Sequence, residues 1–496
     1  MRGRGSARRA GLAPPGGEDL NRRPAAPLPA VFAVVAAALA LKLVLLAGVA
    51  GKRPHSVVYI DTGTYLRPAL ALLRHGSFSP GPEAVPEPEI NRTPGYPFIV
   101  AAAWRLLGER PWVPPFLGAL LSAGTALVAA RLATRLFGGR AGVAAALLVS
   151  CEPGTFLRSL DVLSDTPFTL ALTLFVSALA GYADGDGTSP VRAGFWLALA
   201  TLVRPLSYYL LPPGALFVLI AFHRRGRSFR AACGAAAAFL LPAVLLVGGW
   251  ETRNLVRANA FTLSPIASSE LLFYRAAPVL ARAEGVSVPE MQERLGNRER
   301  WYRSGGGTER EIFGEARYRD LFPATSGLSL VELNARWRRQ AIAIFAAHPF
   351  LTAAMAAKGA AVLLLTPSSL ILSLQYGLFV PGATLVALYE DQRVGPFALR
   401  LAHASPWLFA VSAGLVALLA ALWGAACRGL WLARLEVPAP VHAALLGTFL
   451  YVVVVSAGFE ASDDRYRLPL VPIGCVYAAR VFAGPPARTN RIISAA

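Results

Sequence analysis

Long apolar stretches separated by short loops recur between residues 28 and 483, and they constrain the fold more than any other feature. Hydrophobic residues make up 55% of the 496 positions, and charged residues make up only 16%. A soluble domain carries about 25% charged residues, whereas a membrane-spanning helix needs about 20 consecutive apolar residues. The composition therefore excludes a compact soluble enzyme and predicts an all-α polytopic membrane protein.

We expect about ten to twelve spans, and the first of them is an uncleaved helix because its apolar run is too long for a signal peptide. Arginines in alternate loops fall on one side, which the positive-inside rule assigns to the cytoplasm. The basic tail 1–27, which we expect to be disordered, and the tail 484–496 lie on that side. The segment 350–390 either crosses the bilayer twice or lies in the interface. The candidate spans are 28–50, 112–135, 141–157, 166–181, 193–203, 206–222, 231–250, 406–427, 438–457 and 468–483.

The net charge of +19 comes almost wholly from arginine, because the chain has only three lysines. Many of these arginines lie in loops between apolar runs, so anionic lipids are the expected partners and nucleic acid is not. The four cysteines are far apart, and the six histidines lack the spacing of metal ligands. We therefore assign no metal-binding residue and no cofactor, although a divalent cation remains compatible with the acidic residues discussed below.

Two long segments are left on the outer face, 51–111 and 251–349. In the first, apolar residues at helical spacing predict an amphipathic juxtamembrane helix that ends at His75, with Gly76 as its C′ residue. The sequence Asn91-Arg-Thr-Pro-Gly-Tyr-Pro97 opens a second short helix that ends near Gly108. The large segment 251–349 is expected to form a partly helical cap with a flexible glycine tip at 304–307.

Asp61 precedes the first of these helices, and Thr-Pro-Gly-Tyr-Pro at 93–97 opens the second. Four further motifs follow in the order Leu163-Ser-Asp165-Thr-Pro-Phe168, Leu202-Val-Arg204-Pro205, Trp250-Glu-Thr-Arg253-Asn254 and Asp464-Arg465-Tyr466-Arg467-Leu-Pro469. By order and spacing over about residues 28–483, the chain resembles the GT-C glycosyltransferases. More narrowly, it is similar to bacterial relatives of protein O-mannosyltransferases and the lipid A aminoarabinose transferase. The resemblance implies a GT-C-like transmembrane core, a polyprenyl-phosphate sugar donor and an acceptor reached from outside.

Two carboxylates are candidate catalytic groups. Asp61 could act as the general base that takes a proton from the acceptor hydroxyl, or it could simply cap the helix that follows. The family's second acidic residue corresponds by position to Asp165, with Asp161 one helical turn before it. Asp165 could orient the acceptor, hold a cation, tune Asp61 by charge repulsion, or serve only as a helix cap before Thr-Pro.

The donor phosphate requires cationic groups near the membrane surface. Arg465, Tyr466 and Arg467 lie immediately before the last span, where a phosphate could meet two guanidinium groups and a helix N-terminus. These arginines could instead be interfacial residues whose charged ends reach water. Arg204 is a second candidate because an arginine in so apolar a context needs a partner.

Support for the acceptor or for the outer loops is assigned to three further residues. Arg253 and Asn254 begin the large loop and either serve the acceptor site or only anchor the loop. Tyr65 lies on the first amphipathic helix, one turn after Asp61.

The functional hypothesis is therefore an inverting membrane glycosyltransferase of the plasma or inner membrane. It moves a sugar from a polyprenyl phosphate to an extracytoplasmic hydroxyl on a glycan, lipid or protein. One alternative is a secondary transporter or lipid flippase, although such proteins often show repeated halves and midplane charges. Another alternative is a glycan ligase or polymerase that uses a lipid-diphosphate donor.

Overall fold

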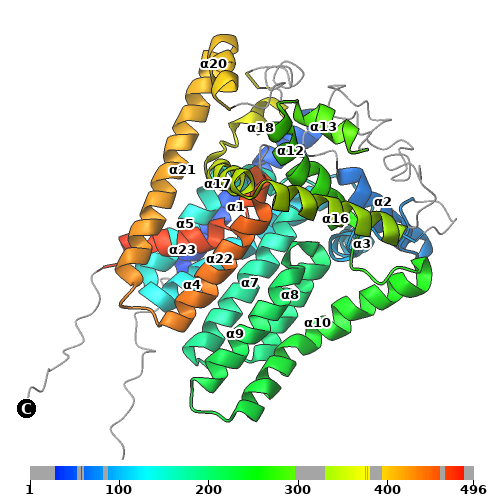
Figure 1. Ribbon diagram of the computed structural model, residues 1–496. Helices are drawn as coiled ribbons and strands as arrows, with labels where there is room; N and C mark the ends of the chain where they lie inside the picture. Colours follow the sequence, from blue (N-terminus) through cyan, green and yellow to red (C-terminus); the bar gives the residue numbers. More distant parts are fainter. Residues whose placement is uncertain are drawn as a thin grey trace, which may run out of the picture.

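The structure is a computed structural model that describes residues 28–52, 57, 61–81, 88–296, 330–374, 376, 378–379, 394–458 and 464–484. Over these residues every regular element is helical and no strand is present (Figure 1). The predicted tail 1–27, all but the first residue of the predicted tail 484–496, and the glycine tip at 304–307 lie outside the described residues. The expected all-α fold class is confirmed.

Seven helices of the described chain are long and apolar enough to cross a membrane, so the protein is a multi-pass membrane protein. An eighth candidate is a pair of helices, α16 (Leu330–Ala347) and α17 (Pro349–Leu365), bent by 101°. The bend falls at Pro349, whose ring cannot continue the preceding helix. The seven are α1 (Leu28–Lys52), α4 (Val113–Phe137), α7 (Asp165–Asp184), η2 with α9 (Pro205–Leu210 and Leu211–His223), α10 (Phe229–Ala258), α21 (Pro406–Ala433) and α22 (Ala439–Ser456).

Three predicted spans form helices too short to cross the bilayer alone. They form α5 (Gly139–Cys151), α8 (Pro190–Val203) and α23 (Val471–Ala479), the last continued by η6 (Arg480–Phe482). A helix of 13 residues is about 20 Å long and does not cover the hydrocarbon layer alone. Longer helices pack beside each of them: α4 against α5, α7 and α10 against α8, and α21 against α23. The described chain therefore has fewer full-length spans than the ten to twelve expected.

The two predicted outer segments contribute a group of short helices at one end of the bundle (Figure 1). α2 (Thr62–His75) ends at Gly76, whose φ of 64° is left-handed, as the sequence predicted. α3 (Gly95–Leu107) ends at Gly108. The described part of the large segment adds α11 (Ile266–Ser269), the π-helix η3 (Glu270–Ala276), α12 (Ala277–Glu284) and α13 (Val288–Arg294). α16 packs against η3 and α12.

Two arginines, at the ends of α4 and α9, contact the end of α7 and the turn after it. Arg135, in the last turn of α4, pairs with Asp186 at 2.9 Å. Arg225, just after α9, donates to the carbonyl oxygen of Tyr182. The loops after α4, α7 and α9 thus share one end of the bundle, as the predicted distribution of arginines requires. In the segment 350–390, the structure describes α17 and α18 (Ser369–Leu374), and α20 (Val394–Ala404) follows.

Candidate active site

Asp61 lies at the entrance to α2, where its carboxylate makes no capping bond to the described backbone of that helix. Instead, its Oδ1 accepts from Arg92 Nη2 at 2.8 Å and its Oδ2 accepts from Arg465 Nη1 at 3.1 Å. The side chain is 27% exposed, so the carboxylate is bound on both oxygens yet still reachable. Helix capping is therefore not what this side chain does.

Two opposing influences set the pKa of the Asp61 carboxyl. Burial raises the pKa, but the guanidinium groups of Arg92 and Arg465 lower it by charge and by hydrogen bonding, to about 2. Asp61 is therefore ionised at neutral pH, which a general base requires. Its basicity is weak as long as both arginines stay bound to it.

Arg92 is a further candidate residue of the site, and the sequence analysis did not predict it. Its Nε donates to Thr64 Oγ1 at 2.8 Å and its Nη1 to the Tyr65 hydroxyl at 3.2 Å, and its Cζ lies 4.6 Å from the Tyr65 ring centroid. The backbone N–H of Arg92 donates to Glu89 Oε1 at 3.0 Å. Tyr65, predicted as a support residue, thus orients Arg92. The available signal was the position of Arg92 inside the Asn91–Pro97 motif.

The same motif is packed directly onto the end of α8. Thr93 Oγ1 donates to the carbonyl oxygen of Val203 at 3.0 Å. A Cβ on Gly95 would lie 2.7 Å from the backbone nitrogen of Val203 and 2.8 Å from the carbonyl oxygen of Leu202. Only glycine permits this approach, which places the start of α3 beside Arg204.

Asp165 and Arg204 form a second ion pair in the site. Asp165 is the first residue of α7, and Ser164 occupies the N-cap position expected for it. Arg204, in the break between α8 and η2, donates through Nη1 to Asp165 Oδ1. The arginine expected in apolar surroundings has therefore found a carboxylate partner. The neighbouring Ser164 hydroxyl lies 3.0 Å from the Tyr65 hydroxyl, which connects this pair to the Arg92 side of the site.

Tyr466 contacts an arginine of each pair. Its ring centroid is 4.8 Å from the Cζ of Arg465 and 5.1 Å from the Cζ of Arg204. Its hydroxyl accepts from Arg465 Nη2 at 2.9 Å. Arg465 and Arg204, both predicted to bind the donor phosphate, are thus brought to one aromatic ring, each with a carboxylate partner.

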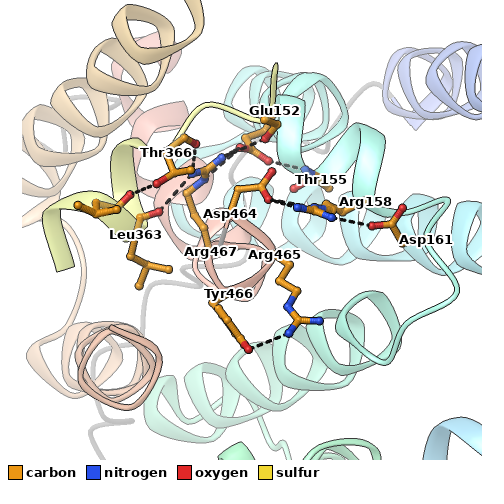
Figure 2. A network of polar contacts seen from close by, with 12 residues as sticks. Glu152, Thr155, Arg158, Asp161, Leu363, Thr366, Asp464, Arg465, Tyr466 and Arg467 are labelled. Carbon is orange, nitrogen blue, oxygen red and sulfur yellow. Dashed lines mark hydrogen bonds and ion pairs between the residues drawn. The ribbon is translucent and has the colours of Figure 1, made fainter. Parts of the chain in front are cut away.

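Arg467 contradicts the expectation that it faces a phosphate. Its side chain is fully buried, at 0% exposure. The guanidinium donates to Glu152 Oε1 and to the carbonyl oxygens of Leu363 and Thr366, on the far side from Arg465 (Figure 2). These bonds occupy the donors that a phosphate would need, so Arg467 does not face the candidate phosphate site. Sequence alone could not separate two arginines that are only two positions apart.

Arg253 and Asn254 take the anchoring role that the sequence left open. α10 continues to Ala258, so both residues belong to its last turns and not to the start of a loop. Arg253 donates to the carbonyl oxygens of Glu89 at 2.7 Å and Phe78 at 2.9 Å. Asn254 Nδ2 donates to the carbonyl oxygen of Thr262 at 2.8 Å. The pair ties the first outer segment to the second.

Within the described ranges, no three His, Cys, Asp or Glu side chains are grouped so that they could hold a metal ion. Asp161, one turn before Asp165, pairs with Arg158 at 3.1 Å (Figure 2).

Residues 91–250 match the sequence model of a family described as dolichyl-phosphate-mannose-protein mannosyltransferase. The resemblance expected from the sequence is confirmed over this segment. The match includes Arg92, Asp165 and Arg204, whereas Asp61 and Arg465 lie outside it. No curated protein matches the chain.

Solved structures with a similar arrangement are distant in sequence. The apo oligosaccharyltransferase of Archaeoglobus fulgidus is 14% identical with a TM-score of 0.44, covering 91% of this chain and 50% of its own. ArnT from Cupriavidus metallidurans bound to undecaprenyl phosphate is 13% identical with a TM-score of 0.38, covering 91% of this chain and 78% of its own. The chain thus spans about half the length of the archaeal enzyme.

Proposed function

We propose that the protein transfers a sugar from a polyprenyl-phosphate donor to an acceptor hydroxyl on the outer face of the membrane. The observation that carries this proposal is the meeting of Asp61 and Arg465, a candidate base and a candidate phosphate ligand, beside the Arg204–Asp165 pair. The match of residues 91–250 to a family of lipid-phosphate-dependent mannosyltransferases supports the same reaction class.

The donor phosphate binds between Arg465 and Arg204, whose Cζ atoms lie 4.8 and 5.1 Å from the Tyr466 ring centroid. Guanidinium groups form paired, charge-assisted hydrogen bonds with phosphate oxygens, and these bonds are stronger than neutral ones. The phosphate replaces carboxylate oxygens as the hydrogen-bond acceptor, so the two acid–arginine pairs hold the cationic groups in place before the donor arrives.

Donor binding also prepares Asp61 for its role. When Arg465 turns toward the phosphate, Asp61 loses one of the two guanidinium groups that lower its pKa. Its pKa then rises toward the ordinary value, and the carboxylate becomes a stronger base. Arg92, held by Tyr65 and Thr64, keeps the carboxylate oriented.

The reaction is a single displacement. The acceptor oxygen attacks the anomeric carbon, the bond from that carbon to the phosphate oxygen breaks, and the proton moves to Asp61. The polyprenyl phosphate leaves as an anion stabilised by Arg465 and Arg204, so no separate acid is needed. One displacement inverts the anomeric configuration. Asp165 acts by holding Arg204 and not as a second base.

The acceptor approaches from the end of the bundle where α2, α3, α12, α13 and α16 gather (Figure 1). We place that end outside the cytoplasm and the arginine-bearing turns inside, in a plasma or inner membrane. Arg253 and Asn254 shape this entrance indirectly, because they tie the two outer segments together.

The test is sugar release from a panel of labelled polyprenyl-monophosphate and polyprenyl-diphosphate sugars by the purified protein in nanodiscs. Water can serve as a slow acceptor, so the natural acceptor is not required. We expect release from a monophosphate donor. Release only from diphosphates would favour a ligase or polymerase instead. No release, with movement of the lipid across liposome membranes, would favour a flippase or transporter.

A further inference from the structure

The short helix α6 (Pro153–Arg158) carries an ion pair at each end. Before its start, Glu152 Oε2 accepts from the backbone N–H of Thr155 at 2.6 Å, while its Oε1 accepts from Arg467 Nη2 at 2.9 Å. At its end, Arg158 donates through Nη2 to Asp464 Oδ1 at 2.6 Å and through Nη1 to Asp161 Oδ2 at 3.1 Å. Arg158 Nε also donates to Asp464 Oδ1, at 2.9 Å.

Asp464 and Arg467, which pair with Arg158 and Glu152, are the first and last residues of η5 (Asp464–Arg467). Between them lie Arg465 and Tyr466, which extend away from α6 toward the active site (Figure 2). We propose that Glu152, Arg158, Asp464 and Arg467, here called the α6 brace, position Arg465 for the donor phosphate. This inference rests on the proposed function, and none of the four residues touches the phosphate.

The ion pairs of the brace fix the geometry of the side chains more closely than the stability of the fold requires. All four side chains are buried, with exposures of 3% for Glu152, 6% for Arg158, 3% for Asp464 and 0% for Arg467. Buried ion pairs are costly to desolvate, and well-packed apolar residues often stabilise a fold as well. What ion pairs supply in addition is fixed geometry, because guanidinium donors lie in one plane. Arg467 also donates to Thr366, which fastens η5 to the end of α17.

Gly154 provides a way to disturb the brace without removing a charge. A Cβ at this position would lie 3.2 Å from Arg467 Nη2 and 3.1 Å from Ser368 Oγ. Gly154→Ala therefore displaces Arg467 slightly while every ionic group remains. Gly248→Ala is a matched control, because a Cβ on Gly248 would meet nothing within 4 Å.

A second variant, Arg158→Lys, keeps the positive charge but offers one ammonium group in place of three directed donors. Its matched control is Arg135→Lys, which alters an Arg–Asp pair in the last turn of α4, outside the site. The measurements are the Kd of each variant for undecaprenyl phosphate in nanodiscs and its thermal unfolding midpoint, beside wild type and Arg465→Ala.

We expect Gly154→Ala and Arg158→Lys to raise the Kd by about tenfold, because misplacement of a positioned group by less than 1 Å weakens its interaction. The two controls should keep the wild-type Kd. A purely structural role would lower the unfolding midpoint of both variants and leave their Kd unchanged, which would overturn the inference. Wild-type protein that binds no polyprenyl phosphate would instead overturn the proposed function, and the brace with it.

Discussion

Arg465 donates to Asp61 at 3.1 Å although 404 positions separate the two residues in the chain. The contact joins the segment that enters the last helix to the first outer segment and thereby closes the site. In the proposed mechanism, the phosphate ligand Arg465 and the base Asp61 are therefore paired with each other before the donor binds. Binding of the donor phosphate then separates Arg465 from Asp61. The same step that binds the donor therefore also makes Asp61 a stronger base.

Arg465→Ala should weaken donor binding more than it slows the chemical step. A charged hydrogen bond contributes about 1.5–3 kcal/mol, which corresponds to an increase of roughly tenfold to a hundredfold in the donor KM. Steady-state kinetics against donor concentration measure this effect. An unchanged KM with a reduced kcat would contradict the assignment of Arg465 to the ground-state phosphate.

Arg92→Gln should move the acid limb of the kcat/KM profile to higher pH. The Arg92 guanidinium lowers the pKa of Asp61 to about 2 together with Arg465. Loss of that charge raises the pKa, so Asp61 becomes protonated at a higher pH than in wild type. Measured from pH 4 upward, the profile of the free enzyme should be flat on its acid side for wild type, whose Asp61 pKa is about 2, and should fall on that side for the variant. If the two acid limbs coincide, Arg92 does not control the base.

Arg467→Met should mainly destabilise the protein. The substitution leaves Glu152 buried without its guanidinium, which costs about 3–5 kcal/mol when one partner of a buried pair is removed. Thermal unfolding in detergent measures the loss. The double variant Glu152→Gln with Arg467→Met removes both charges and should recover part of the stability. An Arg467→Met protein as stable as wild type would contradict the assignment of Arg467 to a buried ion pair with Glu152.

Gly95→Ala should also lower stability, by a different route. Its Cβ would come within 2.8 Å of the backbone at Leu202 and Val203, and the end of α8 must shift. Such overpacking costs about 1–3 kcal/mol, and here it displaces the neighbouring Arg204. Both the unfolding midpoint and donor affinity should fall relative to Gly248→Ala. Wild-type values for Gly95→Ala would show that the contact is not needed.

The sequence indicated most helices because apolar runs and end signals are local. α2 and α3 end at Gly76 and Gly108 as expected, because the residue after the last helical turn is chosen by the local backbone conformation. The lengths of α5, α8 and α23 were less predictable. Whether an apolar segment spans the bilayer or is enclosed by neighbours depends on packing that only the fold decides.

The ion pairs within the site were harder to predict from the sequence than the helices. Asp61, Asp165, Arg204 and Arg465 were each identified from local motifs, but their pairing depends on contacts between distant segments. Arg92 was overlooked because the Thr-Pro-Gly-Tyr-Pro sequence beside it carried the resemblance. Arg465 and Arg467 look alike in the sequence, and only the short η5 turn directs one to the site and the other to Glu152.

The most direct test of the account is the rate of sugar release by Asp61→Asn beside wild type, at saturating donor in nanodiscs. Asp186→Asn is the matched control, because Asp186 is also a partly exposed partner of an arginine, with 33% exposure against 27% for Asp61. Loss of a general base should reduce kcat by about 10²–10⁴-fold, while the control keeps the wild-type rate. Folded Asp61→Asn protein that releases sugar at the wild-type rate would contradict the central claim and leave Asp165 as the next candidate.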